Sequence, residues 1–251
     1  MITLQKASLG KRIIAAIFDF ILLSIIAVGL AAVFSAVFGY NGHMDTVNEA
    51  YAKYQKEYGV ELQITAEQYE AFDEAQKQNY DAALTALNTD EDVIYAYNML
   101  INLTMLIMTL SILISVIVIE FVVPKLFGNG QTLGKKIFGI GLMHTEGIEV
   151  SSVQLFARAV LGKFVFGLMI PLSMIMMIFF NAIGVVGMAI LLILAVAQVA
   201  CLIATKTGSP IHDVIAKTVA VDIASQRIFK TREDLIEFVK ARHAEKAARA
   251  D

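Results

Sequence analysis

The chain has little charge, a single cysteine and no tryptophan. Charged residues make up 17% of the 251, whereas a soluble domain averages about 25%. Cys201 is the only cysteine, which excludes an intramolecular disulfide framework. What the chain has instead is apolar sequence, because 57% of its residues are hydrophobic and its mean hydropathy is +0.67. This composition predicts an integral membrane protein.

Four stretches are long and apolar enough to cross a bilayer, at 13–38, about 93–123, about 164–180 and about 185–204. Lys11 and Arg12 precede the first stretch, as basic residues precede the apolar region of a signal peptide. The stretch is longer than such a region and contains an aspartate, so we interpret it as a membrane span. The fold class expected is an all-α polytopic membrane protein with four transmembrane helices.

Basic residues lie before span one, between spans two and three, and after span four, whereas 41–97 has three lysines against twelve acids. The positive-inside rule therefore predicts a cell (inner) membrane protein with both termini cytoplasmic. The basic side suits lipid headgroups, and we expect no nucleic-acid partner. The chain divides into a cytoplasmic N-terminus with helix one (1–40), an acidic helical extracytoplasmic insertion (41–92), helix two (93–123), a cytoplasmic Gly-rich loop (124–157), helices three and four (158–204) and a cytoplasmic tail (205–251).

The acidic insertion is predicted to be a helical hairpin. Its apolar and aromatic residues recur at helical spacing, at Val47, Tyr51, Tyr54 and Tyr58. Thr65 and Gln68 have the spacing of a capping box, and Thr89 with Asp92 is expected to cap the second span. The tyrosine stripe is either the seam between two helices or a face that binds a partner. In the tail, Thr231 and Asp234 are expected to cap an amphipathic helix over 231–250.

Glycines and two lysines crowd the segment 128–141. A phosphate-binding P-loop needs four residues between its first glycine and the Gly-Lys pair, but Gly128 and Gly134 are separated by five. The alternation over 137–143 instead predicts a short extended segment, followed by a turn at 144–147.

Three motifs together resemble the RDD family, named for one arginine and two aspartates. They are Arg12 with Asp19, the run 130–136 (Gly-Gln-Thr-Leu-Gly-Lys-Lys), and 211–216 (Ile-His-Asp-Val-Ile-Ala) followed by 218–221 (Thr-Val-Ala-Val). The resemblance covers about 11–222 and implies a triad of Arg12, Asp19 and Asp213. It also implies a membrane protein for which transport, and in some members sodium/proton exchange, has been suggested. The long insertion departs from the pattern, and Lys217 stands where a small residue is expected.

Charged residues are expected to meet near the inner leaflet, where the topology brings three acids and three bases to one depth: Arg12, Asp19, Glu120, Arg158, Lys163 and Asp213. Asp19 is the deepest, and a charge at membrane depth costs a few kcal/mol unless it faces protein or water. Seven residues, or about 10 Å of helical rise, separate it from Arg12, so a direct bond would be stretched. We expect Asp19 to reach Lys163, Arg158 or Ser115, and Arg12 to reach Asp213 or Glu120.

Two interpretations of this charge network stay open. It is either a structural lock between helices or a transport site in which a carboxylate, Asp19 or Asp213, exchanges a proton for a cation. Pro171 favours transport because it frees the carbonyl of Gly167. His212 is either a proton-access group or an ordinary interfacial histidine.

No hydrolytic or redox constellation can be assembled, and no two of the four histidines have metal-ligand spacing, so we expect no enzyme, cofactor or metal site. The leading functional hypothesis is transport of small ions or solutes, with exchange of protons for Na⁺, K⁺ or Li⁺ as its specific form. Four spans make a small bundle, so we expect a homo-oligomer. The alternative is a non-transporting adaptor or assembly factor that binds an envelope partner through 41–92.

Overall fold

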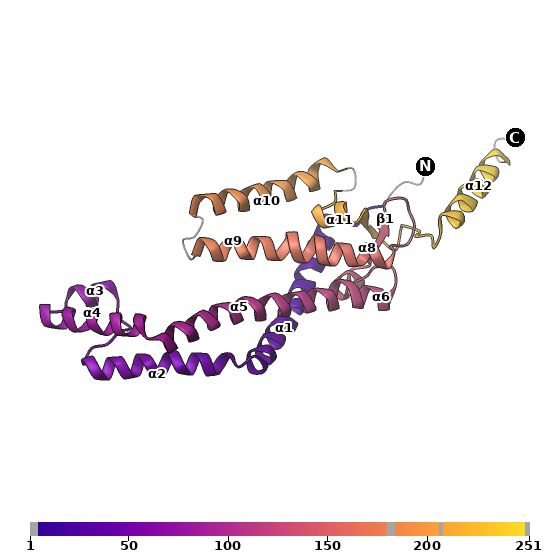
Figure 1. Cartoon of the computed structure of the whole chain (residues 1–251). Helices are drawn as coiled ribbons and strands as arrows, with labels where there is room; N and C mark the ends of the chain where they lie inside the picture. The colour runs from indigo at the N-terminus through magenta and orange to yellow at the C-terminus, as the bar shows by residue number, and fades with distance from the viewer. Residues whose placement is uncertain (1–4, 180–183, 206–207, 249–251) are drawn as a thin grey trace. The chain divides into compact units, whose positions relative to one another are not determined.

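The structure is a computed structural model that describes residues 5–179, 184–205 and 208–248 (Figure 1). The expected segments 1–40, 158–204 and 205–251 therefore each lie partly outside the described residues. Four helical stretches are long and apolar enough to cross a membrane, at Leu9–Val37, Glu91–Phe127, Ser152–Ile178 and Val185–Ala204. The chain is 76% helical. The predicted all-α class with four transmembrane helices is confirmed.

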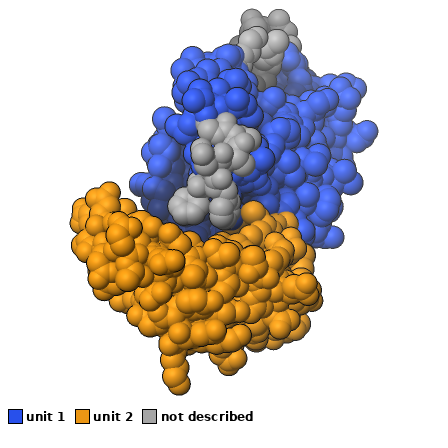
Figure 2. Space-filling model, turned by 60° about the vertical axis from the view of Figure 1, so that its left-hand side comes forward, with its two compact units in different colours: residues 1–27, 112–251 blue, residues 28–111 orange. Residues whose placement is uncertain are grey.

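The chain forms two compact units, coloured separately in Figure 2. One comprises 28–111, and the other comprises 1–27 with 112–251. The long helices α1 (Leu9–Val37) and α5 (Glu91–Ile117) each contribute to both units. The 28–111 unit is thus larger than the acidic insertion predicted over 41–92, because it also includes the end of α1 and most of α5.

The 28–111 unit is built on α2 (Tyr40–Tyr58), α3 (Ala66–Glu70) and α4 (Glu74–Thr89). Helices α2 and α4 pack together around a core that includes Tyr54, Ala83 and Leu87. The Tyr54 hydroxyl donates a hydrogen bond of 2.7 Å to Asp90 Oδ2. The tyrosine stripe on α2 is therefore occupied by packing within the unit, as the seam interpretation requires.

Capping residues in the sequence fix where two helices of this unit, α3 and α5, begin. The Thr65 and Gln68 capping box is present as predicted. The cap of α5 is Asp90 rather than Thr89: its Oδ1 accepts from the backbone amides of Asp92 at 3.0 Å and Val93 at 3.3 Å. Asp90 has the extended backbone of an N-cap, whereas Thr89 still belongs to α4.

In the other unit, two of the spans contain π-helix. Helix α5 continues into η1 (Val118–Val122) and α6 (Val123–Phe127), and α8 (Ser152–Ala157) continues into η2 (Arg158–Met169) and α9 (Ile170–Phe179). The third span thus begins well before the predicted 164, because Arg158 and Lys163 lie inside it. Pro171 is the second residue of α9, and the helix continues through it. The fourth span is α10 (Gly184–Ala204), which packs on α9.

A two-stranded ribbon adds a small β element to this unit. Strand β1 (Ile140–His144) pairs antiparallel with β2 (Thr218–Asp222), which follows α11 (Ile211–Ile215). The N-terminal segment joins the ribbon, because the amide of Ala7 donates to the carbonyl of Ala220 at 3.1 Å. The extended segment predicted over 137–143 starts three residues late, because 133–137 forms the short helix α7 (Leu133–Ile137).

Helix α12 (Arg232–Ala248) ends the described chain. Thr231 and Asp234 cap it reciprocally, as predicted, through hydrogen bonds of 3.1 and 3.0 Å. Phe238 packs against Phe229, with ring centroids 5.2 Å apart. Part of the apolar face of this amphipathic helix therefore packs on the chain itself, and a role of the helix at the membrane surface stays a prediction.

Lys217, which stands where a small residue was expected, has a left-handed backbone with φ 53°. This conformation costs a residue with a Cβ atom roughly 1–2 kcal/mol. We predict that Lys217→Gly stabilises the protein by up to about 1 kcal/mol in thermal unfolding, because glycine lacks that penalty. Lys217→Ala, the control, removes the same charge and keeps the Cβ, so equal stabilisation by alanine would contradict the backbone explanation.

Candidate functional site: a buried charge network

Asp19 is 3% exposed and is held by the start of helix α7. Its Oδ1 accepts a hydrogen bond of 2.8 Å from the amide of Gly134, and its Oδ2 accepts one from the hydroxyl of Thr132. Thr132 is also the N-cap of α7. A Cβ atom on Gly134 would lie 2.4 Å from the carbonyl oxygen of Ala15, so only glycine lets α7 approach α1 this closely.

Of the expected partners of Asp19, Lys163 and Arg158 are therefore wrong, whereas a contact with Ser115 stays a prediction. Among the described residues, no base forms an ion pair with it. The physical reason is that α7 begins beside Asp19 and offers a free backbone amide and a hydroxyl, the groups that normally satisfy an acid at a helix N-terminus. The hydrogen bonds to Asp19 come from neutral groups, so the positions of the charged residues in the sequence do not predict them.

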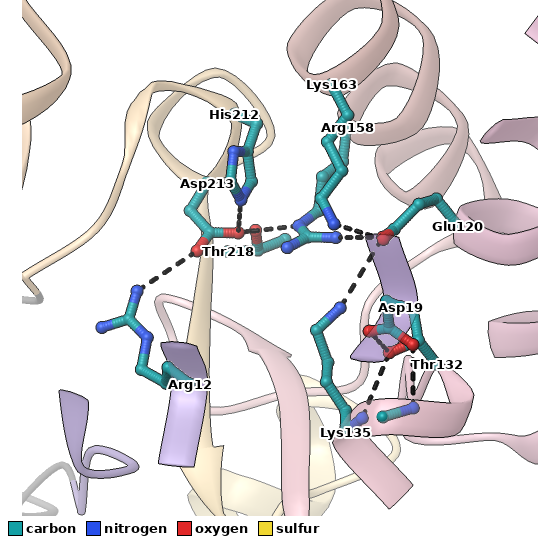
Figure 3. Close-up of polar contacts among 11 residues, drawn as sticks. Arg12, Asp19, Glu120, Thr132, Lys135, Arg158, Lys163, His212, Asp213 and Thr218 are labelled. Atoms are coloured by element: carbon teal, nitrogen blue, oxygen red, sulfur yellow. Dashed lines mark hydrogen bonds and ion pairs between the residues drawn. The ribbon is translucent and has the colours of Figure 1, made fainter. Parts of the chain in front are cut away.

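Arg158 links the two other buried acids of the network (Figure 3). Its Nε donates to Asp213 Oδ1 at 2.7 Å, and its Nη1 donates to Glu120 Oε2 at 3.0 Å. All three residues are at most 3% exposed. Charge-assisted bonds of this kind are the strong ones among protein hydrogen bonds, and the planar guanidinium fixes their directions.

Glu120 receives two further bases. Lys163 Nζ donates to its Oε1, and Lys135 Nζ lies 3.7 Å from its Oε2. Arg158 and Lys163 are five residues apart, a spacing that places side chains on different faces of an α-helix. In η2 the backbone bonds join residues five apart, as from Ile170 N to Val165 O. The π-helix therefore brings both bases to the same side, where they meet Glu120.

Asp213 is the second acid held by Arg158. Thr218 Oγ1 donates to its Oδ1 at 3.0 Å, and Arg12 Nη2 lies 3.8 Å from its Oδ2, so Arg12 has one of its two expected partners. Arg12 also donates to the carbonyl of Gly208 at 2.8 Å. Burial alone would raise the pKa of Asp213, but the charge of Arg158 outweighs it and holds the pKa well below the usual range. Asp213 thus stays ionised.

His212 lies beside this acid, with its Nε2 3.8 Å from Asp213 Oδ1. Burial lowers the pKa of His212 to about 3, against the opposing effect of Asp213. The imidazole is therefore neutral near pH 7, which favours the interfacial-histidine interpretation over proton access. Gly162 of η2 gives α11 room, because a Cβ there would lie 2.4 Å from His212 Cβ.

Lys135 is a member of the network that the sequence did not reveal. It is 8% exposed, and no described residue accepts a hydrogen bond from its Nζ. Burial, helped by the charge of Arg158, lowers the pKa of Lys135 to about 7 despite the nearby Glu120. Its neighbour Lys136 is exposed and lies over the ring of Phe127. The only available signal was the place of Lys135 in the run 130–136 that resembles the family, and that run does not distinguish Lys135 from Lys136.

Two cavities of about 220 Å³ each adjoin the network. Both are lined by Asp19, Lys163 and His212. The first also has Arg12, Lys135, Arg158 and Asp213 on its wall, and the second has Glu120, Gly167 and Gln198. Asp19 thus stands where the two cavities share a wall.

No group of three or more histidine, cysteine, aspartate or glutamate side chains able to hold a metal ion occurs in 5–179, 184–205 and 208–248. The network is built from ion pairs and hydrogen bonds among helices and the loop between spans two and three. The three regions that carry the sequence motifs supply Arg12, Asp19, Lys135 and Asp213, whereas η1 and η2, outside those motifs, supply Glu120, Arg158 and Lys163.

Four apolar spans and a buried charge network together define an integral membrane protein. The sequence model of the RDD family matches residues 6–217, so the chain belongs to the RDD family. No curated protein and no solved structure matches it. The matched range contains Arg12, Asp19 and Asp213, the residues assigned to the family triad by position. In the structure, Arg12 lies beside Asp213, whereas Asp19 is held separately by α7.

Gly134 provides a test of the close contact between α7 and α1. We predict that Gly134→Ala destabilises the protein by about 1–3 kcal/mol in thermal unfolding, the usual cost of overpacking, because the new methyl group would meet the α1 backbone. Gly29→Ala is the control, since that helical glycine has open space around it. Equal stability of Gly134→Ala and wild type would show that α7 does not rest on α1.

Arg158 provides a second test. Arg158→Met leaves two buried acids each short of a partner, and removing one member of a buried ion pair costs about 3–5 kcal/mol. We predict a loss of this size in unfolding experiments in detergent. Lys11→Met is the comparison, because it breaks the exposed 2.8 Å pair with Asp222 and should change stability little. Similar effects of the two substitutions would contradict the structural weight given to Arg158.

Proposed function

We propose that this RDD family protein transports small ions, and that Asp19 is the carboxylate at which a proton is exchanged for an alkali cation. The observation that carries the proposal is the position of Asp19 between two cavities. A group reachable from both can bind an ion on one side and release it on the other. Exchange of this kind needs a buried acid whose charge is satisfied alternately by a proton and by a cation.

The chemistry around Asp19 suits such an exchange. Its two hydrogen bonds, from Thr132 and Gly134, leave lone pairs on both carboxylate oxygens. Gln198 and Gly167 line the second cavity, and the side-chain oxygen of Gln198, which accepts a hydrogen bond of 3.0 Å from the amide of Ile211, keeps a second lone pair for a cation. Hard cations bind oxygen ligands of these types. Glu120 and Asp213 are less suited to exchange, because bases already occupy them: Arg158 binds both, and Lys163 binds Glu120.

The wider setting of the proposal follows from charge and size. The distribution of basic residues supports an inner-membrane protein with both termini cytoplasmic, which puts the network near the inner leaflet. Four spans are few for a transport path, so we propose that the working form is a homo-oligomer. The network supports ion movement rather than an enzymatic reaction. The alternative, an adaptor that binds an envelope partner through 41–92, stays a prediction.

Asp19→Asn tests the transport proposal directly. Proteoliposomes that contain the protein and an internal pH dye would receive pulses of Na⁺, K⁺ or Li⁺. We predict cation-driven proton movement for wild type and a flux equal to that of empty liposomes for Asp19→Asn, because an amide cannot carry the proton. Asp222→Asn is the matched control: it removes a half-buried acid of β2 outside the network and should keep the wild-type flux.

Two outcomes would count against the proposal. Background flux from folded wild-type protein with every cation would remove the exchange function. Wild-type flux from Asp19→Asn would leave transport in place and move its site to another group.

A further inference from the structure

The Nζ atom of Lys135 is the most unusual polar group of the network. It is buried, yet none of the described residues accepts any of its three hydrogen bonds, and the nearest acid oxygen lies 3.7 Å away. A buried ammonium that makes no hydrogen bond is costly, so a native protein that keeps one normally supplies a ligand. Lys135 also lines the first cavity, in which a ligand would have room.

The charges around this cavity are unequal. Four bases meet three acids in the network: Arg12, Lys135, Arg158 and Lys163 against Asp19, Glu120 and Asp213. His212 adds no charge near neutral pH. Each acid already accepts hydrogen bonds from at least one group other than Lys135. One positive charge is therefore left over, and it falls on the base that has no acceptor.

We propose that the first cavity binds one small monovalent inorganic anion, of the chloride type, at Lys135. A single negative charge balances the network, and the ammonium supplies hydrogen bonds that no protein group receives. A divalent anion such as hydrogen phosphate would overcompensate the surplus and face the carboxylates of Asp19 and Glu120. Apolar residues such as Ile13, Ala15 and Leu202 make up much of the wall, and an apolar surrounding strengthens the attraction between an anion and the ammonium.

This anion site is independent of the transport proposal, although the two share a cavity wall. An anion at Lys135 cancels the surplus charge and so favours a cation at Asp19, and the reverse holds by thermodynamic linkage. The site can nevertheless exist in a protein that moves no ions. Binding measurements therefore test it without any transport assay.

The experiment uses the full chain, purified in neutral detergent and dialysed into sodium gluconate. Titration with sodium chloride or bromide at constant sodium and ionic strength is followed by calorimetry and by the unfolding temperature. We predict saturable binding at pH 6 and a matching rise in the unfolding temperature for wild type. Lys135→Met should bind about tenfold or more weakly, because it loses charged hydrogen bonds. The control Lys136→Met, at the exposed neighbouring lysine, should bind as wild type does.

The pH dependence supplies a second readout. The groups that face Lys135 are Glu120 on η1, Arg158 and Lys163 on η2, and Asp19 on α1. With its pKa lowered to about 7, Lys135 is charged at pH 6 and mostly neutral at pH 9. Chloride should therefore bind wild type more weakly at pH 9, and this pH dependence should be absent in Lys135→Met.

The folded state of Lys135→Met is expected to be at least as stable as wild type in gluconate, since the substitution removes a buried charge without an acceptor. If it fails to fold, Lys135→Gln and the wild-type titration decide the question. Identical wild-type behaviour in chloride and gluconate would overturn the proposal, as would full chloride binding by either Lys135 variant. Stabilisation by phosphatidylglycerol in nanodiscs but not by chloride would also overturn it, because the ligand would then be a lipid headgroup.

Discussion

The guanidinium of Arg158 is the group on which the buried charge network, and with it the unit of residues 1–27 and 112–251, depends. It is buried between Asp213 and Glu120, so it joins α11, η1 and η2 by two charge-assisted hydrogen bonds. An arginine cannot lose its proton in a protein, so both acids must stay with it or leave a buried charge unpaired. Each further contact extends this pair of bonds: Thr218 and Arg12 to Asp213, and the two lysines to Glu120.

The helices meet this demand by departing from regular α geometry. Glu120 lies in η1 and Arg158 in η2, so each end of their ion pair is on a π-helical stretch. Wide turns of this type are frequent at functional sites, and they change which side chains share a face of the helix. Here they let Arg158 and Lys163 act on one acid. Two glycines let neighbouring elements approach each other closely: Gly134 allows α7 to contact α1, and Gly162 allows η2 to contact α11.

The sequence predicted those features that depend on long apolar runs or on charge. It located the four spans, although it placed the start of the third too late, and it named Asp213 as one of two expected partners of Arg12, because opposite charges at one depth attract each other. It did not predict the partners of Asp19, which are a backbone amide and a hydroxyl on a five-residue helix too short to show periodicity. It also missed Lys135, since two adjacent lysines look alike until the helix that carries them is placed. The pairing of β1 with β2 joins distant segments that no local pattern connects.

The origin of the site's parts has a consequence for biosynthesis. Asp19 and Arg12 lie in the first span, but their partners are made much later, at 132–134 and 208–213. Since chains emerge from the ribosome N-terminus first, the first helix must reach the membrane with an acid and a base that have no protein partner yet. The first helix can therefore reach its final position only after the last fifth of the chain has been made. The bridge between Lys6 and Val221 of β2 can likewise form only after this last part of the chain has been made. The ribbon therefore completes the unit late in biosynthesis.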